Sequence, residues 1–275
     1  MPYRTACAAA APRRLTLLGP LTLTERAPDA PLDLPGGRAA LLFALLAAHR
    51  NRVVDYPTIV DTLWPDSPPQ TARRTVASLV SRLRQSVGAC LERIGPGYRL
   101  DTTHWQVDLD EAARLVTAAE QHLAGQRAPE ADAAARQALD LLTAGRAVED
   151  YPTQPWAEDL DRAAELLLRR ARRAAWPAAA EVGGHRRSAD LAAAAIAVDP
   201  YDEQAVRAVM AAEYRLGSPG AALRAFHRLQ HTLRQDFGID PDGRTLALHR
   251  AILQGGRLPG REPKHAAGPV PSPVA

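Results

Sequence analysis

Residues 69–100 read "PQTARRTVASLVSRLRQSVGACLERIGPGYRL". Proline at the start and no further helix breaker before Gly88 predict a helix over residues 69–87, ended by Gly88 in a left-handed conformation. At 100° per residue this helix has one narrow apolar seam, formed by Val76, Val80, Leu83 and Val87. A seam of this kind must pack against a core, so the helix belongs to a folded domain.

The face opposite the seam is polar and carries no carboxylate. Arginine can reach guanine edges in the DNA major groove, glutamine suits adenine, and hydroxyls suit phosphates or either base. We therefore predict a DNA-reading face, with a plain solvated face as the alternative. Its candidate residues are Thr71, Arg73, Arg74, Ser78, Ser81, Arg82 and Gln85.

The stretch "RIGPGYRL" at residues 93–100 allows two interpretations, a phosphate-binding loop or the tip of a β-hairpin. A phosphate loop would open a helix and carry Gly-Lys-Ser or the spaced glycines of a dinucleotide site, and neither is present. Gly95-Pro96-Gly97 instead separates two short alternating runs, 90–94 and 98–100, as in a hairpin. We predict that this hairpin contacts DNA beside the helix, through Arg93, Gly97, Tyr98 and Arg99.

The residues before this helix complete a small domain. Residues 14–23 predict two short strands joined by a turn at Gly19-Pro20, with residues 32–34 as a third strand. A helix over 38–49 and a short helix capped by Asp55 and stopped at Trp64-Pro65 follow. Strands, three helices and a terminal hairpin make a winged helix-turn-helix.

The charge distribution agrees with binding of a polyanion by the first part of the chain. Residues 1–107 carry 13 basic and 8 acidic side chains, whereas residues 108–275 carry 21 and 23. Local positive potential attracts DNA, although arginine stems can also simply cover apolar surface.

The second half is predicted to be all-helical. Gly184 and Gly217 each open a helix that leads toward an Asp-Pro pair. The separation between these two glycines is close to the length of a tetratricopeptide unit. Such helix pairs present surfaces to partner proteins. Pro177 is expected to bend the third helix. The predicted helices are 108–124, 130–144, 157–182, 186–198, 202–216, 219–236 and 242–254.

The sequence contains no recognisable catalytic or cofactor motif. His227 and His231 have zinc-compatible spacing, but no third ligand stands out, so we predict no metal, no cofactor and no enzyme activity. The basic run 169–173 is interpreted as a solvated helix face, with contact to polymerase or DNA as the alternative. The dispersed tryptophans argue against a stacking platform for single strands.

Membrane and disulfide signals are weak. The longest apolar run, residues 39–48, is too short to cross a bilayer. Cys7 and Cys90 lie far apart in the sequence, so we expect no disulfide and a cytoplasmic, nucleoid-associated protein. Residues 1–13 and 255–275 are expected to be a flexible and a disordered tail.

Taken together, "LLGPLTL", "LPGGRAALLFALL", "LWPDSPPQTARRTVASLVSRLRQSVG", "GPGYRL" and "AVRAVMAAEYRLGSPGAALRAFHRLQHTLRQDFGIDPD" resemble the Streptomyces antibiotic regulatory protein family. The resemblance covers residues 14–254. It implies an OmpR-type winged helix over 14–103 and a bacterial transcriptional activator domain of tetratricopeptide-like helices over 104–254. In this family the recognition helix falls on residues 69–87 and the wing on 90–101.

The same resemblance implies an activator of a secondary-metabolite (antibiotic) gene cluster. Such an activator binds promoter direct repeats as a homodimer and contacts RNA polymerase holoenzyme through its sigma subunit. The sequence departs from the family at residues 138–152, which lack a tryptophan often found before the glycine, and at Pro177. The rival hypothesis is a helical-repeat scaffold or ligand sensor whose winged helix serves protein interaction, because fold alone does not fix function.

Overall fold

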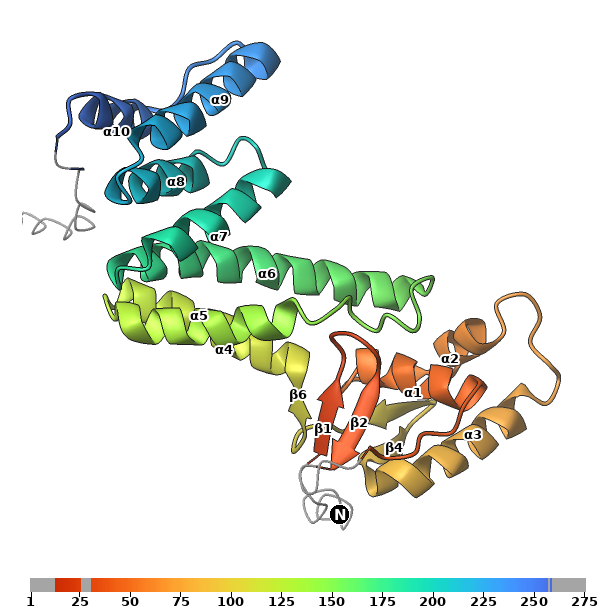
Figure 1. The fold of residues 1–275 in the computed structure, drawn as a ribbon. Coiled ribbons are helices and arrows are strands. Elements are labelled where there is room, and N and C mark those ends of the chain that lie inside the picture. Colours follow the sequence, from red (N-terminus) through yellow and green to blue (C-terminus); the bar gives the residue numbers. More distant parts are fainter. Residues whose placement is uncertain (1–12, 26–30, 257, 259–275) are drawn as a thin grey trace, which may run out of the picture. The chain divides into compact units, whose positions relative to one another are not determined.

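The computed structural model describes residues 13–25, 31–256 and 258 (Figure 1). The chain is mainly helical with two small sheets, and it divides into two compact units, Met1–Ala175 and Trp176–Ala275. The division falls inside one long helix, α6 (Pro155–Glu181). The domain boundary at residues 103 and 104 stays a prediction.

The first sheet of unit 1 has the strand order β2-β1-β6. The strands β1 (Arg13–Thr16) and β2 (Thr22–Glu25) form the predicted antiparallel pair across the Gly19-Pro20 turn. Residues 32–34 form no strand, so that prediction was wrong. The segment meets β2 only in an isolated bridge between Thr24 and Pro31, beside which the Leu32 N–H donates to the Leu23 carbonyl at 2.8 Å. The other edge of β1 pairs with the parallel strand β6 (Gln106–Val107), a short segment more than 80 residues away.

Three helices pack against the sheets of this unit: α1 (Arg38–Ala48), α2 (Tyr56–Leu63) and α3 (Ala72–Val87). Asp55 caps α2 as predicted, because its Oδ1 accepts a hydrogen bond of 2.9 Å from the Thr58 backbone N–H. Hydrogen bonding to Thr58 also lowers the pKa of Asp55. Helix α3 begins at Ala72, three residues later than predicted.

The second sheet contains the predicted hairpin, in the order β3-β5-β4. Strands β4 (Leu91–Ile94) and β5 (Gly97–Leu100) are antiparallel, and β3 (Val54–Asp55) pairs with the other edge of β5. Gly88 has the positive φ expected of it, 64°, but its ψ of −145° is not left-handed helical. The chain leaves α3 in this more extended conformation and enters a short 3-10 turn, η1 (Gly88–Cys90), that leads into β4.

The expectation of no disulfide was wrong for Cys90, which is 1% exposed and disulfide-bonded. Distance along the chain, on which that expectation relied, does not fix distance in space. Cys7 and the greater part of both predicted tails lie outside the described residues. Among the helices of the described residues, none is both long and apolar enough to cross a membrane.

The helices after the second sheet are joined to the first sheet by several hydrogen bonds, of which the Asp108 carboxylate accepts three. Helices α4 (Asp108–Ala124) and α5 (Ala128–Leu142) follow β6 directly. The Asp108 carboxylate accepts hydrogen bonds of 2.9–3.0 Å from the backbone N–H groups of Leu17 and Leu18. Burial of this group raises the pKa of Asp108. The Val148 N–H donates to the Leu17 carbonyl at 2.7 Å, so two segments of the helical half pair with one turn of the sheet.

Unit 2 is built from consecutive antiparallel helices after the end of α6. They are α7 (His185–Val198), α8 (Glu203–Arg215), α9 (Pro219–Phe237) and α10 (Gly243–Leu253), and their ends lie within one residue of the predicted ends. Pro177 lies inside α6, which continues to Glu181. A core of small and branched side chains joins α8, α9 and α10 around Met210 and Phe226.

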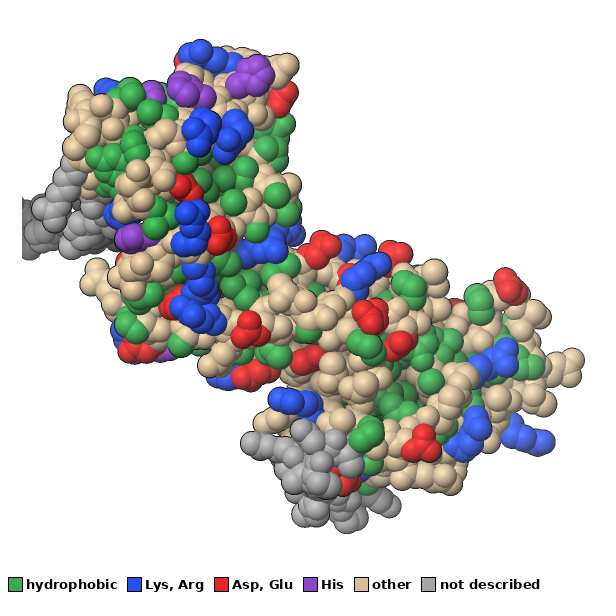
Figure 2. Space-filling model, in the orientation of Figure 1, with side chains coloured by type: hydrophobic (Ala, Val, Ile, Leu, Met, Phe, Trp, Pro, Cys, Tyr) green, Lys and Arg blue, Asp and Glu red, His purple; other side chains and the backbone are tan. Residues whose placement is uncertain are grey.

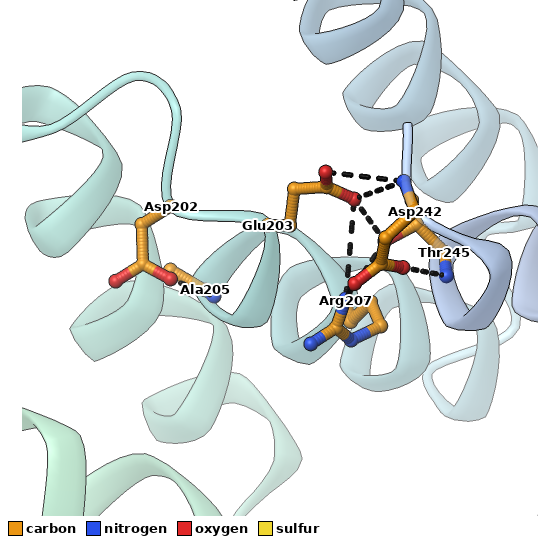
Figure 3. Close-up of polar contacts among 6 residues, drawn as sticks. All are labelled: Asp202, Glu203, Ala205, Arg207, Asp242 and Thr245. Carbon is orange, nitrogen blue, oxygen red and sulfur yellow. Dashed lines mark hydrogen bonds and ion pairs between the residues drawn. The ribbon is translucent and has the colours of Figure 1, made fainter. Parts of the chain in front are cut away.

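A polar network fixes the start of α8 to the start of α10 (Figure 3). Asp202 caps α8 through the Ala205 N–H at 3.0 Å, and Asp242 caps α10 through the Thr245 N–H at 2.6 Å. Glu203 accepts from the Asp242 N–H at 2.9 Å and from the Thr245 hydroxyl at 2.7 Å. Each of the two Asp-Pro pairs in the sequence thus precedes a capping aspartate. The second of these, Asp242, is held to α8 by its hydrogen bond to Glu203.

Candidate nucleic-acid interface

Helix α3 presents the predicted polar face to solvent. All of its apolar seam is buried, and Ala72 and Leu79 are buried with it. The opposite side is free of contacts with the domain core, so it can be approached by a ligand. The exposed candidate residues are Thr71, Arg73, Arg74, Ser78, Ser81, Arg82 and Gln85.

The arginines of α3 differ in how firmly they are held. Arg84 donates its Nε–H to the Leu91 carbonyl at 3.0 Å, which ties the helix to the hairpin. The Arg73 guanidinium lies 5.2 Å from the centre of the Tyr56 ring. Among the described residues, no carboxylate pairs with Arg74 or Arg82. These two side chains therefore keep their full charge and their freedom to reach a phosphate or a base.

Gly97 allows the backbone of β5 to lie close to the backbone of β3. It is buried, and a Cβ atom at this position would lie 2.2 Å from the Val54 carbonyl oxygen and 2.9 Å from the Val53 Cγ1. Only glycine permits this separation without movement of β3. Gly97 thus positions the wing against the rest of the domain.

The two hairpin arginines lie in different environments. Arg99 pairs with Glu92 directly across the strands, at 2.6 Å, and both are partly buried. Arg93 is exposed and, within the described residues, forms no ion pair. Tyr98, the cross-strand neighbour of Arg93, is half-buried. Of the two, Arg93 is the one whose charge is not met by a carboxylate among the described residues.

The structure adds Arg52 to the basic side chains of the wing sheet. Arg52 is exposed and stands two residues before β3, whose strand partner is β5. The Asn51 N–H donates to the Leu100 carbonyl at 2.9 Å and holds this turn to the hairpin. Sequence reasoning missed Arg52 because the pairing of β3 with β5 has no local signal.

Residues of the two other candidate sites contact neighbouring helices. Arg170 of the basic run makes two hydrogen bonds to Glu120, at 2.7 and 2.9 Å. The His227 ring lies 5.8 Å from the His249 ring. Across the part of the chain that the structure describes, no three metal-binding side chains gather in a geometry that could hold an ion.

Two protein-family models match the chain. The model "Transcriptional regulatory protein, C terminal" matches residues 31–100, which hold the three helices and the hairpin. The model "Bacterial transcriptional activator domain" matches residues 107–253, more than half of the chain. The division between the two models falls next to β6 and Asp108.

Curated relatives are regulatory proteins of mycobacteria and streptomycetes. EmbR of Mycobacterium tuberculosis is 32% identical over 86% of this chain, which spans 62% of the length of EmbR. MoaR1 of the same species is 31% identical, covering 88% of this chain and 79% of MoaR1. DnrI of Streptomyces peucetius is 28% identical, covering 78% of this chain and 82% of DnrI.

A solved structure has the same fold. It is M. tuberculosis EmbR in complex with a low-affinity phosphopeptide, which superimposes with a TM-score of 0.73 at 27% identity. The match covers 91% of this chain and 67% of the EmbR chain.

Proposed function

We propose a specific role for this chain, which belongs to the bacterial transcriptional activator domain family and is a transcriptional regulator with a DNA-binding winged helix. The role is activation of a secondary-metabolite gene cluster on chromosomal DNA. In this proposal the chain binds promoter direct repeats as a homodimer and recruits RNA polymerase holoenzyme through its sigma subunit.

One observation carries the DNA-reading part of the proposal. The exposed face of α3 combines arginines, hydroxyls and an amide with no carboxylate, and the hairpin lies beside it through the Arg84 contact. A solvated helix in a chain with 31 acidic residues would be expected to carry some of them outward. The absence of carboxylates from this face supports contact with a polyanion.

The residues divide into two proposed roles. Arg74 and Gln85 have the reach and the hydrogen-bonding groups to read base edges, and Ser78 and Ser81 can contact bases or phosphates. We assign Arg93 and Arg82 to phosphates. Thr71 and Arg73 lie at the start of the helix, where backbone N–H groups also attract phosphate.

The activator role is supported by the family and by the build of the helical half. The relatives are regulatory proteins of both Streptomyces and Mycobacterium. The resemblance in the sequence to Streptomyces antibiotic regulators favours a biosynthetic cluster as the target. Stacked helix pairs such as α7–α8 and α9–α10 offer surface for a second copy and for polymerase.

Selection of bound duplexes from a random-sequence pool tests the proposal. We expect enrichment of a direct repeat whose half-sites are spaced by about one helical turn, roughly 10–11 base pairs. Transcription from a promoter carrying that repeat should rise when the chain is added to RNA polymerase holoenzyme. A pool that shows no enriched sequence would contradict the proposal and favour a protein-interaction role for the winged helix.

A further inference from the structure

Unit 2 carries a basic helix face that lies outside the winged helix. Helix α9 turns five side chains inward, Ala222, Ala225, Phe226, Leu229 and Leu233. At 100° per residue, its outward donors fall within about 100° of the helix surface and extend over about 17 Å. Figure 2 shows Arg and His side chains gathered over this helix. The exposed residues of this face are Arg224, His227, Arg228, His231 and Gln235.

The charge on the α9 face is not compensated within its own helix. No carboxylate occurs from Pro219 to Gln235, and the first is Asp236 in the last turn. Within the described residues, neither Arg224 nor Arg228 pairs with a carboxylate. Two exposed arginines on α4 and α6 are different, since each pairs with a carboxylate of its own helix: Arg114 with Glu111 and Arg162 with Asp159.

The carboxylates of the neighbouring elements are already engaged. Glu213 of α8 pairs with Arg186 at 3.3 Å. Asp236 accepts a hydrogen bond from the Tyr201 hydroxyl at 3.0 Å, and Asp240 pairs with Arg234 at 2.7 Å.

Helix α10, which packs against α9, contains no carboxylate. Its His249 ring stacks on the Phe226 ring, with the ring centres 3.8 Å apart, and its Arg250 is exposed. The α9 face and its surroundings therefore keep an uncompensated positive charge.

We propose that the α9 face is a second DNA contact, which binds phosphates independently of base sequence. This proposal rests on the DNA binding of the chain. Arg224 and Arg228, one helical turn apart, supply charged forks about 6 Å apart along the axis. Gln235, His227 and His231 add further hydrogen-bond donors, and such a mixture is found at phosphate contacts.

The composition of the face favours DNA over an acidic protein. Protein interfaces have an apolar, often aromatic, centre surrounded by a polar rim. The α9 face has no large apolar side chain among its outward residues. Phe237 and Ile239, which are 58% and 53% exposed, come after Gln235, the last residue of the face. A surface of donors alone suits a phosphate backbone, which offers charge and no apolar groups.

The test is the salt dependence of DNA binding by the full chain. Binding to a labelled duplex of about 40 base pairs and mixed sequence is measured by fluorescence anisotropy at several salt concentrations. Each phosphate contact contributes about 0.9 to the slope of log K against log salt. We expect the double variant Arg224→Ala/Arg228→Ala to lower that slope by about 2, and Arg224→Lys/Arg228→Lys to restore most of it.

Two further variants control this experiment. Arg162→Ala removes an exposed arginine whose charge is already met by Asp159, so the slope should not change. Arg74→Ala/Arg93→Ala tests the winged helix in the same assay. Thermal unfolding followed by circular dichroism shows that each variant is folded.

The outcomes separate this inference from the proposed function. An unchanged slope in the α9 double variant, with a lowered slope in the winged-helix variant, overturns the inference and leaves the winged helix as the DNA contact. Such a result would assign the α9 face to an acidic protein or to solvent. A lowered slope in the α9 variant alone supports the inference and contradicts the assigned reading face.

Discussion

Helices α3 and α9 share a charge pattern and differ in what accompanies it. Each buries one apolar stripe and exposes arginines, and α3 has no carboxylate at all while α9 has only Asp236 in its last turn. Between its arginines α3 carries the short side chains Ser78 and Ser81, whereas α9 carries His227 and His231. Short hydroxyls allow a helix to approach base edges closely, and larger rings hold it at the distance of the backbone. The same charge therefore supports base reading in one helix and phosphate contact in the other.

The elements that surround α3 and α9 also differ. Arg84 ties α3 to a hairpin that can enter the groove beside it. Helix α9 packs between α8 and α10, and no strand flanks it. A hairpin beside a helix can fix the orientation of that helix in a DNA groove. A helix packed between two others exposes only one side to DNA.

The largest expected effect is the loss of sequence preference when Arg74 is removed. Arg74→Ala should weaken binding to a selected duplex by about 10- to 100-fold and relax the preference at one base pair. The matched α9 variant, Arg228→Ala, should weaken binding to selected and scrambled duplexes equally. Anisotropy titrations with the two duplexes check both, and a loss of preference in Arg228→Ala would break the comparison.

The second-largest effect is expected from a substitution in the wing. The α3 surface lies beside a closely packed hairpin, whereas the α9 face does not. Gly97→Ala places a Cβ against the Val54 carbonyl oxygen and should lower the free energy of unfolding by about 1–3 kcal/mol. The control is Gly243→Ala in α10, where nothing lies within 4 Å of the added Cβ. Urea unfolding compares the two variants, and equal stability would show that the wing tolerates the displacement.

A smaller effect is expected from the ion pair within the hairpin. Glu92→Gln leaves Arg99 without its partner, and the released charge can add up to one phosphate contact, or about 0.9 to the salt slope. In the unmodified chain, Arg99→Ala should change the slope less than Arg93→Ala does. If Arg99→Ala and Arg93→Ala lower the salt slope equally, then Arg99 leaves Glu92 and pairs with a phosphate when DNA is bound.

The smallest effect concerns pH and the α9–α10 contact. Burial lowers the pKa of His249, and nearby His227 lowers it further. Because the folded pKa lies below the unfolded value, this group binds fewer protons in the folded state. Its contribution to stability is complete above the unfolded pKa, about 6.5, and is lost as the pH falls through the folded pKa.

His249→Phe should keep the stack on Phe226 and make the unfolding free energy less sensitive to pH below neutrality. Unfolding curves recorded between about pH 7 and pH 5 measure this. An identical pH dependence in the variant would assign the effect to another group. The same variant should leave reading by α3 unchanged.

Local pattern predicted the helices of this chain more reliably than its strands. The end of α3, its buried seam and the cap at Asp55 follow from residues within one or two turns of each other. The strand over 32–34 was wrong because that segment meets β2 only in a single bridge, at Pro31, and does not continue into a ladder. The pairing of β1 with β6 had no local signal either, since β6 comes from far along the chain. The candidate site shows the same division, since exposure of the α3 residues was predictable and the Glu92–Arg99 pair was not anticipated.

The sequence by itself determined which helices form, which face of α3 is buried, and that the opposite face of α3 carries arginine and no carboxylate. These properties depend on periodicity and on the charge of neighbours along the chain. Only the tertiary structure decided that Gly97 must approach Val54, that Arg99 is neutralised while Arg93 is not, and that Asp108 joins the first sheet to the helical half. These are contacts between segments distant in sequence, and no local pattern encodes which partner a backbone edge or a charge will meet.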